Sequence, residues 1–267
     1  MFETISSVQN PRVKNLVRLR EGSHRRRQGK FLIEGYREIK RALATRWPME
    51  TLFFSEDLFK EAESFQLIEA AEDAGLEMVK LSPEAFAKSA YRQGPDGLLA
   101  TGLQKETTLK ELKLSKVPLL LALEALEKPG NIGAVFRTAS AAGVDALILT
   151  NPVTDPYNPN VIRASQGAFF DVPFCQVENA DLMVFLEEHE IRPVLTSPDG
   201  ENLLWDEDLK SPSMILLGSE EKGLSPDWLE TYPACRIPMK GVTDSLNVAA
   251  MAAIATFEAV RQRQTQP

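Results

Sequence analysis

Near its end the chain reads Ile237-Pro-Met-Lys-Gly-Val-Thr-Asp-Ser-Leu-Asn-Val-Ala-Ala-Met251, a polar loop that runs into an Ala-rich helix. Pro238 has no N–H to donate and Gly241 permits positive φ, so the first half of this segment is predicted to be irregular. Its hydroxyl, carboxamide and backbone N–H groups then stand at the N-terminus of a helix over residues 247–261. Such a helix end suits a polar ligand, although simple capping explains a single serine such as Ser245 equally well.

Continuous apolar runs upstream of this loop indicate a buried sheet. Leu119-Leu-Leu-Ala-Leu123 and Met214-Ile-Leu-Leu217 show no alternation of polar and apolar residues, which is typical of parallel strands covered on both faces. Ligands of such sheets collect at the carboxyl ends of the strands. The sequence therefore predicts an α/β fold, with strands at 117–123, 146–150, 192–196, 213–217 and 234–237 and helices at 132–142, 158–169, 182–188 and 226–229.

A second alternation of helices and strands occupies the first hundred residues and predicts a small α/β domain. Its expected strands are 31–34, 49–55, 76–81 and 97–102, and its expected helices are 10–20, 35–46, 58–74 and 83–90. A charged, Thr-rich stretch separates the two patterns. We therefore expect domains at residues 1–105 and 117–267, joined by a linker at 106–116.

The net charge of −8 conceals an uneven distribution. Residues 1–48 carry 12 Lys/Arg and 4 Asp/Glu, a net +8, whereas the remaining residues carry 18 and 34, a net −16. A run of positive charge is usually only a solvated surface. Here the run follows a cationic helix on an otherwise acidic chain, which favours contact with nucleic-acid phosphates by Arg25, Arg26, Arg27 and Lys30.

Composition disfavours several other classes of protein. The apolar content of 43% and the charged content of 25% are ordinary for a soluble globular protein. The chain has no 18-residue apolar run and no signal-peptide pattern, so we expect a cytoplasmic protein without membrane contact. Cys175 and Cys235 are isolated, and His24 lies far from His189, which argues against a metal site and against a disulfide framework.

Two further segments carry polar groups at predicted strand-to-helix turns. They read Glu124-Ala-Leu-Glu-Lys-Pro-Gly-Asn-Ile-Gly-Ala-Val-Phe-Arg-Thr-Ala139 and Leu216-Leu-Gly-Ser-Glu-Glu-Lys-Gly-Leu-Ser225. Neither has the GxGxxG spacing of dinucleotide folds or a Walker lysine. With the loop at 237–247 and the segment Asn160-Val-Ile-Arg-Ala-Ser-Gln-Gly-Ala168, they resemble the motifs of the SpoU (TrmH-like) branch of the SPOUT RNA methyltransferases. The resemblance covers roughly residues 117–260.

This resemblance implies a fold and a reaction. Family members have a parallel-sheet methyltransferase domain whose chain forms a trefoil knot, often preceded by an L30e-like RNA-binding domain, and they dimerise through the C-terminal domain. They transfer a methyl group from S-adenosylmethionine to a ribose 2′-hydroxyl of RNA. The extra N-terminal domain favours ribosomal over transfer RNA, by analogy at the level of the fold.

The resemblance also assigns residues. The implied catalytic residues are Asn131, Arg137, Glu220, Ser245 and Asn247. The implied cofactor-binding residues are Thr196, Gly218, Ile237, Met239 and Leu246, and Arg163 is implied to lie near the RNA. Two routes stay open for the 2′-hydroxyl proton: Arg137 itself, or an RNA phosphate held by Arg137, since a guanidinium resists deprotonation.

Alternative functions also stay open at this point. One is methylation of transfer RNA rather than ribosomal RNA. Another is a catalytically silent RNA-binding relative, against which the intact set of five polar residues argues. The third is an unrelated α/β enzyme with a nucleotide cofactor, against which the missing glycine and lysine motifs argue.

Overall fold

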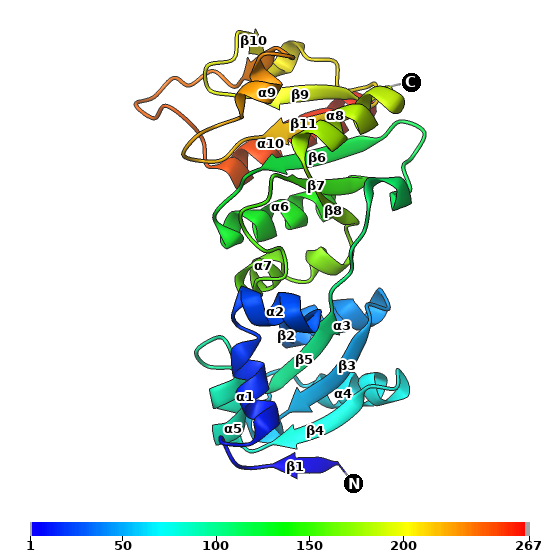
Figure 1. The fold of residues 1–267 in the computed structure, drawn as a ribbon, viewed down its shortest axis with the longest axis vertical. Coiled ribbons are helices and arrows are strands. Elements are labelled where there is room, and N and C mark those ends of the chain that lie inside the picture. The colour runs from blue at the N-terminus through cyan, green and yellow to red at the C-terminus, as the bar shows by residue number, and fades with distance from the viewer. Residues whose placement is uncertain (1, 265–267) are drawn as a thin grey trace. The chain divides into compact units, whose positions relative to one another are not determined.

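The computed structural model describes residues 2–264, which form two compact units (Figure 1). The N-terminal unit contains residues 2–105 together with residues 155–171, and the C-terminal unit contains residues 106–154 and 172–264. Both units are α/β, as predicted. Their boundary differs from the expected division at 105–117, because residues 155–171 belong to the N-terminal unit and residues 106–116 belong to the C-terminal unit.

The N-terminal unit is built on a five-stranded sheet of order β1-β4-β3-β5-β2. Helices α1 and α5 share one buried cluster with the sheet, and α3 and α4 contact each other on its other side (Figure 1). The strands are β1 (Glu3–Ile5), β2 (Lys30–Glu34), β3 (Met49–Phe54), β4 (Glu77–Leu81) and β5 (Leu98–Leu103). The helices are α1 (Pro11–Arg18), α2 (Gly22–Gln28), α3 (Tyr36–Ala44), α4 (Ser64–Asp73) and α5 (Pro83–Ser89).

Local sequence signals account for most of these elements. Asn10 caps α1 by accepting the N–H of Arg12 at 2.8 Å, and Pro11 occupies the first turn, as predicted. The helix expected at 58–74 is shorter, since α4 begins only at Ser64 and a 3₁₀ turn covers Glu56–Leu58. The strand β1 and the helix α2 were not predicted, the latter because its sequence has no apolar periodicity.

Aromatic packing explains why residues 155–171 join the N-terminal unit. Tyr157 lies 4.8 Å from Phe31 between ring centroids, and Phe169 and Phe170 lie 5.5 and 5.3 Å from Trp47. Phe169 is fully buried. Burial of aromatic rings is a large favourable term, so this segment follows its aromatic side chains rather than its neighbours in sequence. It contains α7 (Pro159–Ser165).

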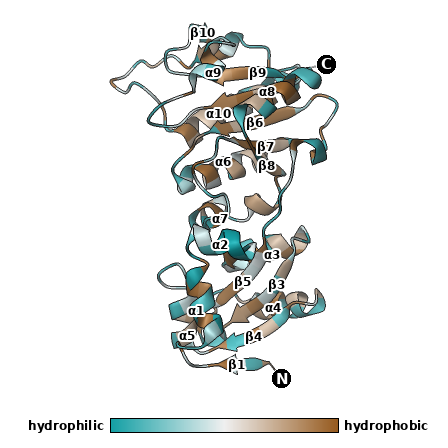
Figure 2. Cartoon of the chain, viewed as in Figure 1, coloured by the Kyte–Doolittle hydropathy of each residue, from teal (hydrophilic) through white to brown (hydrophobic). Residues whose placement is uncertain are grey.

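The C-terminal unit has a seven-stranded sheet of order β10-β12-β9-β11-β6-β7-β8, in which every pairing is parallel. Figure 2 shows hydrophobic colour along β11, as its continuous apolar run predicts. The strands are β6 (Leu119–Glu124), β7 (Ala146–Thr150), β8 (Phe174–Val177), β9 (Arg192–Thr196), β10 (Asn202–Leu203), β11 (Ser213–Leu217) and β12 (Ala234–Arg236). The trefoil knot stays a prediction.

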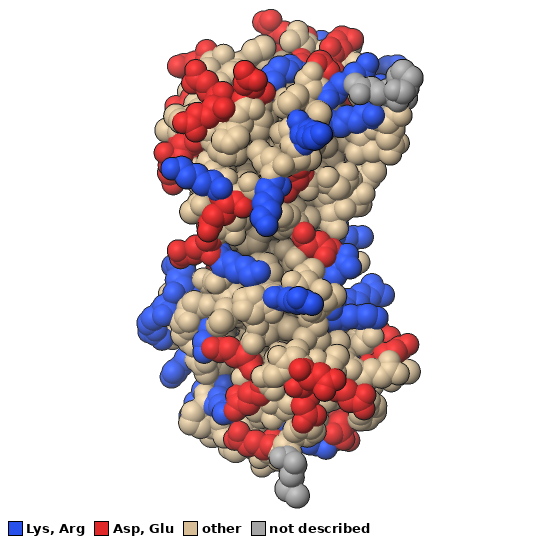
Figure 3. Space-filling view, turned by 90° about the vertical axis from the view of Figure 1, so that its right-hand side faces the viewer, with Lys and Arg blue, Asp and Glu red and all other residues tan. Residues whose placement is uncertain are grey.

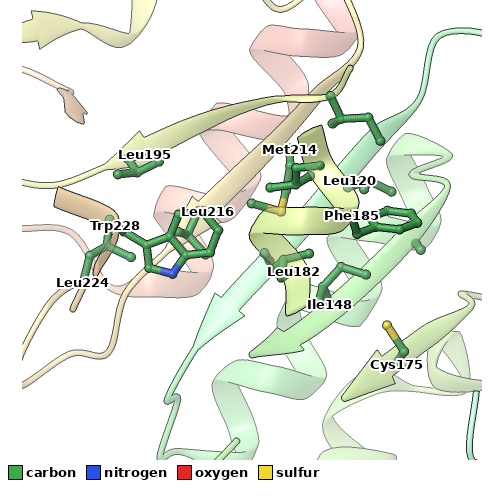
Figure 4. Close-up of a cluster of buried hydrophobic side chains, with 14 residues drawn as sticks. Leu120, Ile148, Cys175, Leu182, Phe185, Leu195, Met214, Leu216, Leu224 and Trp228 are labelled. Atoms are coloured by element: carbon green, nitrogen blue, oxygen red, sulfur yellow. The ribbon is translucent and has the colours of Figure 1, made fainter. Parts of the chain in front are cut away.

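Helices cover both faces of this sheet. On one face, α8 (Asn179–Glu188) and α9 (Pro226–Leu229) contribute Leu182, Phe185 and Trp228 to a cluster with the central strands (Figure 4). On the other face, α6 (Pro129–Ala142) packs beside α10 (Val248–Gln264). The stretch expected to be a linker also packs here: Leu109, Leu112 and Leu114 lie against the same cluster, so 106–116 is part of this unit.

No helix among residues 2–264 is long and apolar enough to cross a membrane. Within the same described part of the chain, no group of three or more His, Cys, Asp or Glu side chains is arranged to hold a metal ion.

Candidate active site

The predicted site residues follow the carboxyl ends of adjacent strands in the C-terminal unit. Strands β12, β9, β11 and β6 are consecutive in the sheet and parallel, so the segments that follow them meet at one sheet edge. Thr196 ends β9, Gly218 follows β11, and Ile237 follows β12. The sheet order therefore brings together segments that are up to about 110 residues apart in sequence.

Three of the five predicted catalytic residues form a connected cluster at this edge. The side-chain amide of Asn131 donates to Glu220, and the amide of Asn247 donates to the Asn131 carbonyl oxygen at 3.3 Å. Lys128 lies 3.9 Å from the same Glu220 carboxylate. Asn131 stands in the first turn of α6, whose N-cap is Lys128, so capping is not its role. Lys128 was missed by the sequence reasoning, because a solvent-exposed lysine at a helix start gives no signal by itself.

Arg137 lies two turns along α6 from Asn131 and is exposed. Among the described residues no hydrogen bond or ion pair engages its guanidinium. A planar fork of five donors that has no intramolecular partner is suited to a phosphate or another anion. Ser245 is likewise exposed, in the loop before α10, and the structure gives its hydroxyl no contact with the Asn131 cluster.

The five predicted cofactor-binding residues divide into two groups. Thr196, Gly218 and Ile237 lie at the sheet edge, where the Thr196 hydroxyl donates to the backbone oxygen of Leu216 at 3.0 Å. Met239 and Leu246 lie on the loop 237–247, each 36% exposed. Figure 1 shows this loop extending away from the body of its unit.

The chemistry of the loop fits S-adenosylmethionine. None of the hydrogen bonds among the described residues involves the segment Pro238–Leu246, so its backbone donors and acceptors are available to the edge of a purine. Met239 and Leu246 add partly exposed apolar surface to the same segment. Small-molecule sites combine apolar surface with a few polar groups, and the loop supplies both.

Gly218 has a structural reason of its own to be glycine. A Cβ atom at this position would lie 2.3 Å from the backbone carbon of Gly223 and 2.5 Å from the backbone nitrogen of Leu224. The turn that carries Glu220 therefore folds back tightly on the end of β11.

A cavity of about 350 Å³ lies near this edge, between residues 199–201 and 229–234. None of the five predicted cofactor-binding residues lines it. The cysteines are not nucleophile candidates: burial raises the pKa of both the Cys175 thiol and the Cys235 thiol to about 12, so both stay protonated at neutral pH.

The basic residues of the N-terminal unit are not equivalent, and the prediction for Arg25 is wrong. Its side chain is 2% exposed, and its guanidinium contacts Asp155 at 2.6 Å and the backbone oxygens of Leu19 and Arg20 at 3.0 and 2.7 Å. A buried, fully engaged guanidinium cannot contact an RNA phosphate. Arg26 and Arg27 are exposed, and Lys30 forms an ion pair with Glu50.

Figure 3 shows that, on the face drawn, most Lys and Arg side chains of the N-terminal unit lie at the level of α2, whereas Asp and Glu gather toward β1. Arg163 is exposed on α7 and therefore belongs to this unit, not to the unit that carries the other motif residues. Both α2 and α7 contact β2. Arg26 and Arg27 on α2 and Arg163 on α7 thus lie on two helices that contact the same strand.

Comparison with known proteins agrees with both units. The SpoU rRNA Methylase family matches residues 118–257, and the MRM3-like substrate binding domain matches residues 10–100. An uncharacterised tRNA/rRNA methyltransferase of Synechocystis sp. is 33% identical, covering 97% of this chain and 94% of the relative. The 23S rRNA (uridine(2479)-2'-O)-methyltransferase of Streptomyces viridochromogenes is 30% identical, covering 90% and 85%.

Solved structures give the same result. The AdoMet-bound rRNA methyltransferase from Sinorhizobium meliloti has a TM-score of 0.89 and 26% identity, covering 100% of this chain and 99% of that chain. The match thus spans both units and the sheet edge where the motif segments meet. The chain belongs to the SpoU rRNA Methylase family and is an RNA methyltransferase that uses S-adenosylmethionine.

Proposed function

We propose that this enzyme methylates a ribose 2′-hydroxyl of ribosomal RNA in the cytoplasm, with Asn131, Glu220 and Asn247 beside the reacting hydroxyl. The observation that carries this proposal is the connected cluster of these three side chains at the carboxyl edge of the sheet. The Streptomyces relative, whose name gives a 23S rRNA 2'-O activity, supports the substrate class. Transfer RNA is the alternative substrate, since the Synechocystis relative is named for both RNAs.

In this proposal the residues divide into two groups. S-adenosylmethionine, held by Thr196, Gly218, Ile237, Met239 and Leu246, supplies an electrophilic methyl group. Asn131 and Asn247 orient the ribose hydroxyl through their carboxamides, and Glu220 holds Asn131 in place. Ser245 lies on the loop between Met239 and Asn247 and reaches the reacting groups once that loop folds over its ligands.

Arg137 serves the RNA side of the site. Its unpaired guanidinium binds the phosphate next to the target ribose, and this phosphate accepts the hydroxyl proton. A phosphate oxygen is an easier acceptor than a guanidinium, which stays protonated in proteins. Fixing the phosphate also fixes the ribose that is attached to it.

A pair of variants tests this division. Arg137→Ala should lower the methylation rate by about 10²–10⁴-fold and leave the S-adenosylmethionine Kd within about twofold, because its role lies on the RNA side. Leu246→Arg should raise that Kd at least about tenfold, since a charge replaces apolar surface in the pocket. Calorimetry and a methylation assay with ribosomal and transfer RNA as separate substrates measure both. A fully active Arg137→Ala enzyme contradicts the assignment, and Arg137→Lys serves as the control that keeps only the charge.

We also propose that the enzyme acts as a homodimer through α10. Ile254 and Phe257 stand one turn apart on this helix and are 37% and 47% exposed. Apolar residues on one exposed helix face favour a protein partner. The helix begins directly after the site loop, so a second copy seated on it would lie beside the site.

A further inference from the structure

A buried carboxylate lies next to the proposed site without belonging to it. Glu124 ends β6 and is 2% exposed, and none of the ion pairs among the described residues involves it. Its Oε1 accepts the side-chain amide of Asn179 at 2.6 Å, and its Oε2 accepts the backbone N–H of Ser225 at 2.8 Å. Burying a carboxylate is costly unless hydrogen-bond donors surround it. Both donors that contact the Glu124 carboxylate, the Asn179 amide and the Ser225 N–H, are neutral.

Glu124 is the centre of a small polar network, which we call the Glu124 clasp: Glu124, Thr150, Asn179 and Ser225. The Thr150 hydroxyl donates to Asn179 Oδ1 at 2.6 Å, and Asn179 Nδ2 also contacts Ser225 Oγ at 3.1 Å. Thr150 and Asn179 are 0% and 4% exposed. Buried networks whose members are all satisfied fix one geometry strongly, because any lost partner leaves a costly unpaired group.

The backbone at the clasp is unusual in the same place. Ala125 and Asn151, which directly follow Glu124 and Thr150, both have left-handed φ values of 51° and 46°. Such conformations are unfavourable for residues other than glycine and persist only where surrounding contacts hold them. Here the Ala125 N–H donates to the backbone oxygen of Thr150 at 3.0 Å, and the Asn179 N–H donates to Asn151 Oδ1 at 3.3 Å.

The Glu124 clasp lies beside the two segments that carry Asn131 and Glu220, namely the start of α6 and the 218–225 turn. Helix α6 begins five residues after Glu124 and carries Asn131 in its first turn. Ser225 ends the turn that carries Glu220, and this turn is closed by reciprocal backbone bonds of 3.1 and 3.0 Å between Ser219 and Gly223. We infer that Glu124 is a positioning residue, which holds the start of α6 and the 218–225 turn at the separation that lets Asn131 and Glu220 meet.

This inference rests on the proposed roles of Asn131 and Glu220. It is tested by exchanging the functional groups of Glu124 and Asn179. Glu124→Gln places an amide against the donors of Asn179 and Ser225, and Asn179→Asp places two carboxylates together. Each should lower kcat at least about tenfold at saturating RNA and cofactor, with both KM values changed less than about threefold. In the double variant the new amide at position 124 can donate to the new carboxylate at position 179 and accept from the N–H of Ser225. The Ser225 hydroxyl, which accepts from Asn179 in the wild type, can donate to the carboxylate at position 179. One buried carboxylate therefore returns, and each of its neighbours again has a hydrogen-bond partner.

The double variant should recover kcat to within about threefold of the wild-type value. All rates are measured well below the Tm of the least stable variant, so that unfolding does not contribute. A merely structural clasp would lower the Tm of each single variant and leave kcat of the folded enzyme unchanged. That result, or a double variant as slow as the singles, overturns the inference.

A second pair of variants applies if the single clasp variants do not fold. Ser225 has φ −68°, which proline adopts, so Ser225→Pro keeps this backbone angle, removes the N–H that Glu124 accepts and forces the carboxylate away from the proline ring. Ser225→Ala keeps that N–H and loses the same hydroxyl. Ser225→Pro should lower kcat at least about tenfold relative to Ser225→Ala, and equal rates contradict the inference.

The proposed roles of Asn131 and Glu220 and the positioning role of Glu124 can be disproved independently. Full activity of Asn131→Ala and Glu220→Ala would remove the proposed site, whatever the clasp variants do. Loss of activity in those two variants, with unchanged kcat in the clasp variants, would remove only the clasp.

Discussion

At the scale of single residues, Arg25 differs from its neighbours Arg26 and Arg27. A run of charged residues does not show which of its side chains are buried and which are exposed. Arg25, Arg26 and Arg27 are consecutive on α2, but one lies against Asp155 and two face solvent. A helix turns by about 100° per residue, so consecutive side chains point in different directions. The guanidinium of Arg25 therefore serves the fold, whereas contact of Arg26 and Arg27 with RNA stays a prediction.

The first prediction separates these two roles. Arg25→Met should lower the free energy of unfolding by about 3 kcal/mol, because Asp155 and two backbone oxygens lose their donor. The change is measured by urea denaturation of the full chain. A decrease below about 0.5 kcal/mol would mean that the buried ion pair contributes nothing net.

Exposed arginines should instead affect the salt dependence of RNA binding. Replacing Arg26 and Arg27 by Ala should reduce the slope of log binding constant against log salt concentration by about 0.7–0.9 for each phosphate that is no longer neutralised. The Tm should stay unchanged. Lys113→Ala with Lys116→Ala is the matched control, since it removes the same charge from exposed positions of the C-terminal unit. Equal slopes in wild type and the Arg26/Arg27 variant would contradict a phosphate contact.

At the scale of elements, α10 is fixed at its last turn and exposed along its middle. The Arg263 guanidinium donates at 2.8–3.2 Å to five acceptors at the starts of β6 and β11, namely the backbone oxygens of Val117, Pro118, Leu209 and Ser211 and the hydroxyl of Ser213. Its N-terminal end carries Asn247 into the site. A helix held in this way can present Ile254 and Phe257 to a partner without moving.

The proposed dimer is tested on this exposed face. Phe257→Glu should weaken self-association at least about 100-fold, because a carboxylate would be buried against a second apolar surface. Sedimentation velocity over a range of concentrations measures the change. Val184→Glu is the matched control, since Val184 is 55% exposed on α8 across the sheet. A Phe257→Glu protein that sediments like the wild type would exclude this face.

At the scale of the whole molecule, the chain leaves the C-terminal unit after β7, contributes residues 155–171 to the N-terminal unit, and returns to β8. Neither unit is therefore a continuous piece of sequence. The aromatic rings of Tyr157, Phe169 and Phe170 depend on Phe31 and Trp47 for their burial.

Because residues 155–171 pack in the N-terminal unit, they should lose their packing partners in a fragment that lacks residues 1–105. A fragment of residues 106–267 should expose the three rings, bind a hydrophobic dye and aggregate, although it holds every predicted catalytic residue. Phe169→Ser with Phe170→Ser in the same fragment should restore a soluble protein that binds S-adenosylmethionine. Dye fluorescence and light scattering make the comparison. A soluble fragment without substitutions would show that the segment needs no partner.

The sequence by itself determined the α/β class, the parallel character of the second sheet and the family. These properties follow from local patterns: β11 coincides with its predicted range because a continuous apolar run is typical of a strand that is buried on both faces. The motif residues Asn131, Glu220 and Asn247 came instead from the resemblance to the family, whose motif segments follow such strands.

Only the tertiary structure decided which polar groups serve the fold and which face the site. Arg25 and Asp155 are 130 positions apart, and Glu124 and Ser225 are 101 apart, so no local pattern marks either contact. A buried arginine or glutamate is recognised only once its donors and acceptors are in place, because its partner determines whether its charge is tolerated. The same holds for residues 155–171, whose aromatic rings pack on the distant residues Phe31 and Trp47.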